Sequence, residues 1–127
     1  MNLLGISLAV SSIALAIFGL TSLALSRATL NRTIHRNGSF GIRTEATTKS
    51  DAAWIAGHEA AAPSLRAFGY LDVTISLALV AVGLALPDLN STLALTIRVI
   101  AYATAFGGFI FSTVKANAAA KEVPRVQ

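Results

Sequence analysis

The sequence predicts an all-α integral membrane protein, a three-helix bundle with an additional interfacial helix on the cytoplasmic side between the first two spans. Two observations lead to this fold. The chain is 54% hydrophobic and only 13% charged, whereas soluble domains contain about 25% charged residues, so too few polar side chains are present to cover a surface in water. Three apolar stretches, at residues 3–25, 67–86 and 93–114, are each long enough to cross about 30 Å of hydrocarbon as a helix.

On this interpretation residues 1–127 form a single membrane domain, with a connection at 26–66 and a tail at 115–127. The first stretch carries no charge and resembles a signal anchor. Cleavage near Ala24 and Ser26 is the alternative, but a cleaved signal peptide has a basic start and a shorter apolar part. The chain contains no cysteine, which excludes disulfides, thiolate metal sites and a cysteine nucleophile.

The distribution of basic residues predicts the orientation. Every Lys and Arg outside the spans lies in the connection or in the tail: Arg27, Arg32, Arg36, Arg43, Lys49, Arg66, Lys115, Lys121 and Arg125. Because basic loops stay in the cytoplasm, we expect the N-terminus outside and the C-terminus in the cytoplasm, in a multi-pass protein of the plasma membrane. Attraction to anionic lipids of the bilayer then accounts for the net charge of +4 without a nucleic-acid partner.

The last two spans are expected to form a tight antiparallel hairpin. Pro87 ends the second helix, and Asn90 or Ser91 can cap the third. Beyond the third span, residues 116–127 are short and polar, so we expect a frayed helix end followed by a disordered tail.

Small residues recur four apart on two of the spans, at Gly5 and Ala9 and at Thr104, Gly108 and Ser112. Faces of this kind let helices approach closely in lipid. Two interpretations stay open. The faces either pack the three spans against one another, or contact a second copy of the chain or a larger partner.

The connection at 26–66 is far longer than two neighbouring helices need, and long connections usually carry function. Its first part, residues 26–36, can extend the first helix. Asn37 and Gly38 then mark a turn, and Gly41 is a second flexible point.

A short helix is predicted to follow. Ser50 is a typical N-cap, and Asp51 lies favourably at the positive end of the helix. The helix should run over 51–62 and end before Pro63. We expect it to lie at the membrane interface, with the ring of Trp54 toward the apolar layer and its N–H toward water.

This segment resembles the signature of the SdpI family. In that family an N-x-x-x-G-[IV]-R-T stretch is followed by T-x-x-S-x-x-x-W-x-x-x-[NH]. The corresponding residues here are Asn37, Gly41-Ile42-Arg43-Thr44, Thr47, Ser50, Trp54 and His58. The match covers residues 37–58, with the flanking spans in matching places, and departs from many relatives only where Glu45-Ala46 replaces a proline.

The resemblance implies a bacterial membrane protein. The family's founding member protects its producer from a secreted toxic peptide and holds a transcription repressor at the membrane. The present chain is much shorter and matches only the part that bears the signature. We therefore expect immunity or envelope protection through binding of a peptide or protein partner. The candidate binding residues are Asn37, Gly41, Arg43, Thr44, Thr47, Ser50, Trp54 and His58.

These residues also have structural interpretations. Arg43 can pin the loop to Asp51 or Glu59, or hold a phosphate or carboxylate ligand. The serine and threonines suit turns and caps. His58 can hydrogen-bond the loop, and a metal site is not expected there, because His35 is the only other histidine and no carboxylate lies at ligand spacing.

Two ionisable residues, Asp72 and Arg98, lie inside spans and are functional candidates for that reason. They lie toward opposite membrane faces, so we do not expect a direct ion pair. Arg98 can extend to the outer headgroups, and Asp72 can meet Lys115, Arg66 or Arg43 near the inner face. Alternatively, Asp72 carries protons along a transport path.

No segment resembles a nucleophile elbow, a phosphate loop or a metal-binding helix, so we expect no enzymatic activity, no cofactor and no metal. Two hypotheses stay open beside the binding role. The chain is either an accessory subunit of a larger membrane complex, or a small proton-coupled transporter built as a homo-oligomer.

Overall fold

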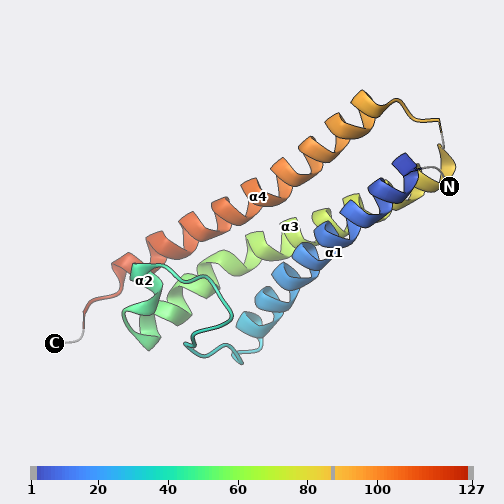
Figure 1. The fold of residues 1–127 in the computed structure, drawn as a ribbon. Coiled ribbons are helices and arrows are strands. Elements are labelled where there is room, and N and C mark those ends of the chain that lie inside the picture. Colours follow the sequence, from blue (N-terminus) through green and yellow to red (C-terminus); the bar gives the residue numbers. More distant parts are fainter. Residues whose placement is uncertain (1–2, 87, 126–127) are drawn as a thin grey trace.

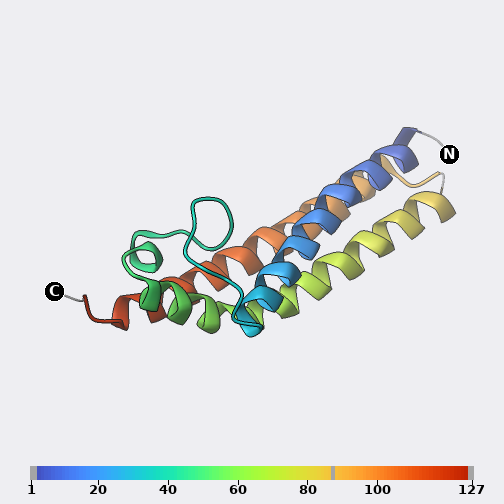
Figure 2. The ribbon, with the colours of Figure 1, turned by 90° about the horizontal axis from the view of Figure 1, so that it is seen from below.

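The computed structural model describes residues 3–86 and 88–125. These residues form α1 (Leu3–Leu30), α2 (Glu45–Thr48), α3 (Asp51–Ala85) and α4 (Ser91–Glu122). The three long helices lie side by side, and α2 with its flanking loops lies at the end of the bundle where α4 finishes (Figures 1 and 2). Each long helix is long and apolar enough to cross a membrane, as the sequence predicts.

All three helices run past the predicted spans on the side of the connection. The helix α1 continues to Leu30, α3 begins at Asp51, and α4 continues to Glu122. The N-terminus and the α3–α4 turn lie at the opposite end (Figure 1). On the side of the long connection, the ends of α1, α3 and α4 therefore project beyond the predicted spans, and the connection lies against them.

The helix expected to end before Pro63 continues through it, so that prediction is wrong. Residues 51–62 are the first turns of α3 rather than a separate interfacial helix. Pro63 is exposed and removes one helical hydrogen bond. Burial of Ala61, Ala62 and Leu65 on the other face offsets this loss, because each is at most 1% exposed.

The expectation of a frayed end after the third span is also wrong for residues 116–122. Ala116 and Ala120 are fully buried, and a Cβ added to Gly57 of α3 would lie 3.0 Å from the carbonyl oxygen of Ala116. The Nζ of Lys49 donates to the carbonyl of Val123 at 2.6 Å, at the negative end of α4. Packing against α3 thus keeps this polar segment helical.

The helices α1 and α3 pack closely along a seam of small residues that recur every seven positions. Seven-residue spacing keeps one face of each helix toward its partner. At one crossing, a Cβ added to Gly19 would lie 2.9 Å from the carbonyl oxygen of Gly69. The seam consists of Gly5, Ser12, Gly19 and Ser26 on α1 and of Ala62, Gly69, Ser76 and Gly83 on α3.

Two serines of the seam bond across it. The hydroxyl of Ser76 donates to the carbonyl of Ser12 at 2.7 Å, and the hydroxyl of Ser26 donates to the carbonyl of Ala62 at 2.8 Å. Both bonds are buried, where water cannot compete for the donors. They hold the two helices in one register.

The small face of α4 is used mainly inside the chain. A Cβ on Gly108 would lie 2.3 Å from the ring of Phe68 on α3, and the hydroxyls of Ser112 and Ser64 are 2.8 Å apart. Thr104 is only partly buried and donates to the carbonyl of Ile100 in its own helix. Internal packing is therefore the interpretation that the contacts of Gly108 and Ser112 support.

Large side chains, in contrast, cover the outside of the bundle. Residues such as Val10, Ile13, Ile17, Ile100 and Ile110 are each about 60% exposed. A continuous band of such side chains is unfavourable in water and favourable in hydrocarbon. The many exposed large apolar side chains fit a bundle surrounded by lipid.

The turn between the last two helices confirms one predicted cap. The side-chain oxygen of Asn90 accepts hydrogen bonds from the backbone N–H groups of Thr92 and Leu93, at 2.9 and 3.3 Å. Pro87, predicted to end the second helix, lies outside the described residues, and α3 ends at Ala85.

Candidate functional site

The candidate site is the segment 37–58, here called the signature module, which comprises a loop, α2 and the first turns of α3. Its loop is held by Asn37. The Asn37 oxygen accepts from the N–H groups of Ser39 and Phe40 at 2.8 and 2.7 Å, and its Nδ2 donates to the carbonyls of His35 and Phe40. One side chain thus closes the predicted turn.

Gly41 allows the loop to touch α3. Its φ of +127° is a conformation that side-chain-bearing residues rarely adopt. A Cβ at this position would lie 2.7 Å from the ring of Trp54 and 2.8 Å from Nε2 of His58. Glycine is therefore required here twice, for the backbone angle and for the space.

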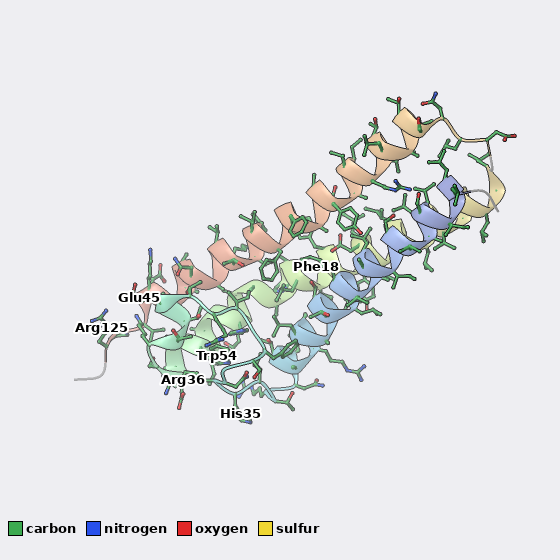
Figure 3. All side chains as sticks on the ribbon, in the orientation of Figure 1. Phe18, His35, Arg36, Glu45, Trp54 and Arg125 are labelled. Carbon is green, nitrogen blue, oxygen red and sulfur yellow. The ribbon has the colours of Figure 1, made fainter. Side chains whose placement is uncertain are left out.

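Trp54 and His58 lie one helical turn apart on α3 and are both fully buried. Their ring centroids are 4.2 Å apart. The predicted orientation of Trp54, with its ring toward the apolar layer and its N–H toward water, is wrong: the loop covers its ring, and its Nε1 finds no hydrogen-bond partner among the described residues. Figure 3 shows Trp54 at the end of the bundle that carries the loop.

His58 connects α3 to the loop through both ring nitrogens. The backbone N–H of Ile42 donates to Nε2 at 2.9 Å, so this nitrogen carries no proton. Nδ1 lies 2.7 Å from the carbonyl oxygen of Trp54 and carries the proton of the neutral ring. His58 precedes the predicted span, and burial lowers the pKa of its imidazole, partly opposed by the bond to Trp54.

This arrangement predicts a loss of stability in mild acid. The stability from neutral His58 is fully present above its unfolded pKa of about 6.5 and is lost as the pH falls toward the lowered folded pKa. We expect the melting temperature in detergent to fall as the pH drops below about 6.5. The variant His58→Gln should lose most of this slope. His35→Gln, at an exposed position, should keep it, and equal slopes in all three proteins would contradict the assignment.

Two threonines order the helix start that follows the loop. Thr44 and Thr47 form a capping box around α2, with the Thr47 N–H donating to the Thr44 hydroxyl and the Thr44 N–H to the Thr47 hydroxyl. The buried hydroxyl of Thr47 also donates to the carbonyl of Ile42 at 2.7 Å. Ser50 caps α3 by accepting from the N–H of Ala53, as predicted.

The arginine that meets Asp51 is Arg36, and not Arg43 as the sequence suggested. Arg36 Nε lies 2.9 Å from Asp51 Oδ1, and its Nη1 donates to the carbonyl of Thr48. Arg43 instead donates to the carbonyl of Gly38 at 2.7 Å, within its own loop. Both pairs are exposed to solvent, so each adds little stability on its own.

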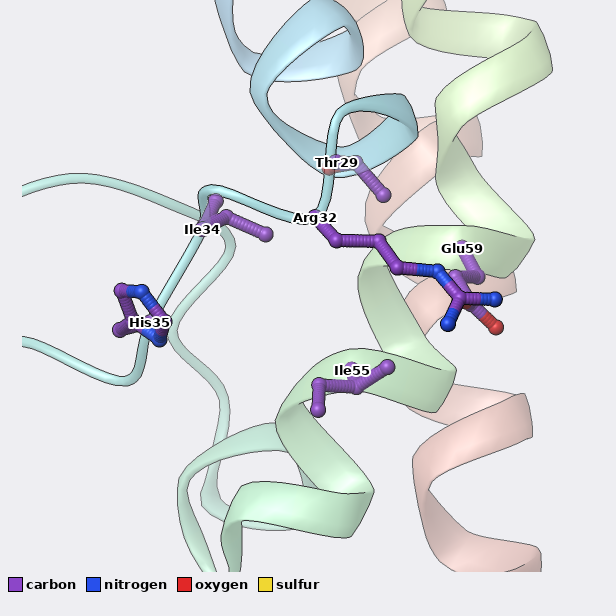
Figure 4. Close-up of a pocket in the computed structure, with 6 residues that line it drawn as sticks. All are labelled: Thr29, Arg32, Ile34, His35, Ile55 and Glu59. Carbon is purple, nitrogen blue, oxygen red and sulfur yellow. The ribbon is translucent and has the colours of Figure 1, made fainter.

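A small cavity opens where the loop approaches α1 and α3. It measures about 190 Å³ and is lined by Thr29, Arg32, Ile34, His35, Ile55 and Glu59. Figure 4 shows the Arg32 side chain extending from the end of α1 toward Glu59. Pockets for drug-sized ligands measure about 300–1,000 Å³, so this cavity has room for one side chain rather than for a cofactor.

The two ionisable residues of the spans do not pair, as expected, but the partners predicted for Asp72 are wrong. Both carboxylate oxygens of Asp72 are buried without a hydrogen-bond partner among the described residues. Arg66, Arg43 and Lys115 form no ion pair with it in that part of the chain. Arg98 donates to the hydroxyl of Ser7 on α1, so it ties two helices together rather than only extending outward.

The structure thus brings the eight predicted binding residues together in one module, whereas Asp72 and Arg98 lie outside it, in α3 and α4. Sequence reasoning missed Arg36 and Ile42. Ile42 is 2% exposed and supplies both the N–H to His58 and the carbonyl to Thr47. The position of Ile42 between Gly41 and Arg43, inside the stretch that resembles the family signature, could have indicated its role.

The sequence model of the SdpI/YfhL protein family matches residues 33–114, more than half of the chain. The chain belongs to the SdpI/YfhL protein family. Comparisons with curated proteins and with solved structures found no match. The SdpI/YfhL match contains the signature module, all of α3 and most of α4, whereas α1 lies before it.

Proposed function

We propose that this SdpI/YfhL protein confers immunity or envelope protection by binding a peptide or protein partner, without catalysing a reaction. The observation that carries the proposal is an exposed rim formed by Ser39, Phe40 and Arg43 of the signature module together with Arg36, the residue directly before it. Arginine and aromatic side chains dominate binding energy at protein interfaces. Asn37, Gly41 and the buried rings hold this rim in place.

Two further features support a peptide or protein as the partner. Phe40 remains 38% exposed although its loop is tightly ordered. The cavity of Figure 4 lies beside the module and has room for one inserted side chain. On this proposal Trp54 and His58 act indirectly, because both are buried and position the loop.

The test is complementation of a deletion strain that is challenged with a fixed panel of membrane-active peptides and detergents. We expect Phe40→Ala combined with Arg43→Gln to lose protection while the protein stays in the membrane with unchanged Trp54 emission. Arg125→Gln, which removes an exposed charge outside the module, should protect fully. Full protection by the rim variant would refute the binding role of the rim.

We also propose that the module faces the cytoplasm, in a plasma-membrane protein with its N-terminus outside. The support is the basic character of the connection and of the tail. Single cysteines can be introduced into this cysteine-free chain at Ser39 and Ser91. An impermeant thiol reagent added to intact cells should label position 91 and not position 39, and the reverse pattern would refute the orientation.

A second candidate function, proton transport by an oligomer, is favoured by Asp72 alone. Its carboxyl group is fully buried in the bundle without a hydrogen-bond partner among the described residues. Intramembrane carboxyl groups of this kind occur in proton relays. Asp72→Asn should then abolish proton flux into proteoliposomes, and unchanged flux would remove this candidate.

A further inference from the structure

An open groove lies between the end of α1 and α3, and none of the rim residues is among its lining residues. Its volume is about 460 Å³. The helix α1 supplies Leu23, Arg27 and Leu30 to the lining of the groove. Asn31 follows directly after α1, and α3 supplies Arg66 and Tyr70. No acidic side chain is among the lining residues of the groove.

The groove lies at the edge of the predicted hydrocarbon layer. Arg27 follows the first predicted span by two residues, and Arg66 precedes the second by one. Leu23 and Tyr70 lie about one helical turn further toward the membrane. Tyrosine is enriched at this depth, where its ring meets hydrocarbon and its hydroxyl meets headgroups.

Both arginines are free to bind an anion. They are exposed, and the ion pair found in the described part of the chain joins Arg36 and Asp51 instead. A guanidinium group presents a planar fork of donors that matches the oxygens of a phosphate. Two cations on one groove also repel each other, and a bound anion relieves this repulsion.

We propose that this groove binds one anionic phospholipid from the leaflet on the side of the signature module. Arg27 and Arg66 hold the headgroup phosphate, Asn31 contacts the polar part of the lipid, and an acyl chain lies along Leu23 and Tyr70. A lipid fits better than free phosphate, because the groove continues from two cations into an apolar surface. The bound lipid bridges α1 and α3 and stabilises their contact.

The experiment measures lipid retention by native mass spectrometry, on the full chain in mild detergent with added phosphatidylglycerol or phosphatidylcholine of equal chain length. We expect one phosphatidylglycerol to be retained in preference to phosphatidylcholine. Arg27→Gln combined with Arg66→Gln should weaken this retention on the order of tenfold, given the contribution of each basic residue to anionic lipid binding. The control variant Lys115→Gln with Lys121→Gln removes two charges from α4. It should change the retention of phosphatidylglycerol less than twofold.

Equal retention of both lipids would overturn the proposal, and so would an equal loss of phosphatidylglycerol retention in the α4 control. The same holds if phosphatidylglycerol raises the melting temperature and millimolar inorganic phosphate alone produces the same rise. Trp54 emission checks that each variant folds. If the double glutamine variant does not fold, Arg27→Lys with Arg66→Lys keeps the charge without the planar fork, and unchanged retention in that variant would also count against the proposed site.

Discussion

Replacing Gly41 by alanine is expected to detach the loop and α2 of the signature module from α3 while the three long helices persist. The new Cβ would lie 2.7 Å from the ring of Trp54 and 2.8 Å from Nε2 of His58, and alanine strongly disfavours a φ of +127°. Strain and overpacking together should cost about 3 kcal/mol. Because Trp54 is the only tryptophan, its emission should shift to longer wavelength.

Gly38 offers a matched control three residues away. It is exposed, it has a negative φ, and a Cβ added there would meet nothing within 4 Å. Gly38→Ala should therefore leave the emission and the melting temperature unchanged. If Gly41→Ala behaved like Gly38→Ala, the loop would not pack on Trp54 and His58 as described.

The second large effect concerns the seam between α1 and α3. Gly19→Ala would place a Cβ 2.9 Å from the backbone oxygen of Gly69 and 3.0 Å from side-chain carbons of Asp72 and Val73. A backbone oxygen cannot rotate away as a side chain can, so the helices must separate. We expect a loss of about 2 kcal/mol, within the range for overpacked cores, measured as a lower unfolding temperature in detergent.

Gly107 on α4 is the control for this substitution. A Cβ added there has open space around it, and alanine favours the helix over glycine by up to about 1 kcal/mol. Gly107→Ala should therefore be neutral or slightly stabilising. A loss of stability equal to that of Gly19→Ala would show that glycine matters for a reason other than the close contact of α1 with α3.

The number of long apolar helices and two caps were predictable, because their signals are local. Long apolar stretches predict spans, and Ser50 and Asn90 cap α3 and α4 through bonds to residues at most three positions away. The antiparallel course of α3 and α4 then follows from the short connection between them. Family membership was also predictable, from the spacing between Asn37 and His58.

What the sequence did not predict depends on contacts between distant segments. Pro63 locally favours a helix end, but buried residues on the opposite face of α3 outweigh it. A tryptophan in this position of the sequence favours the membrane interface, but the ring of Trp54 is covered by the backbone of Gly41. The polar end of α4 stays helical because Ala116 and Ala120 pack against α3. In each case the partner lies on another element, where a local pattern gives no signal.

The seam on α1 and α3 was missed for a different reason. The small-residue faces predicted from the sequence have a spacing of four, whereas the small residues of the seam recur every seven positions, as from Gly5 to Ser12 and Gly19. The two periods describe different contact faces of a helix.

The signature residues form one packed module around a fully buried tryptophan. Fluorescence quenching of Trp54 in proteoliposomes tests it most directly, with acrylamide added from the water and brominated acyl chains placed in the bilayer. The buried ring should resist both quenchers. Strong quenching by brominated lipid would place Trp54 at the membrane interface, and strong quenching by acrylamide would place it in an open loop. Either result would contradict the burial of Trp54 inside the signature module.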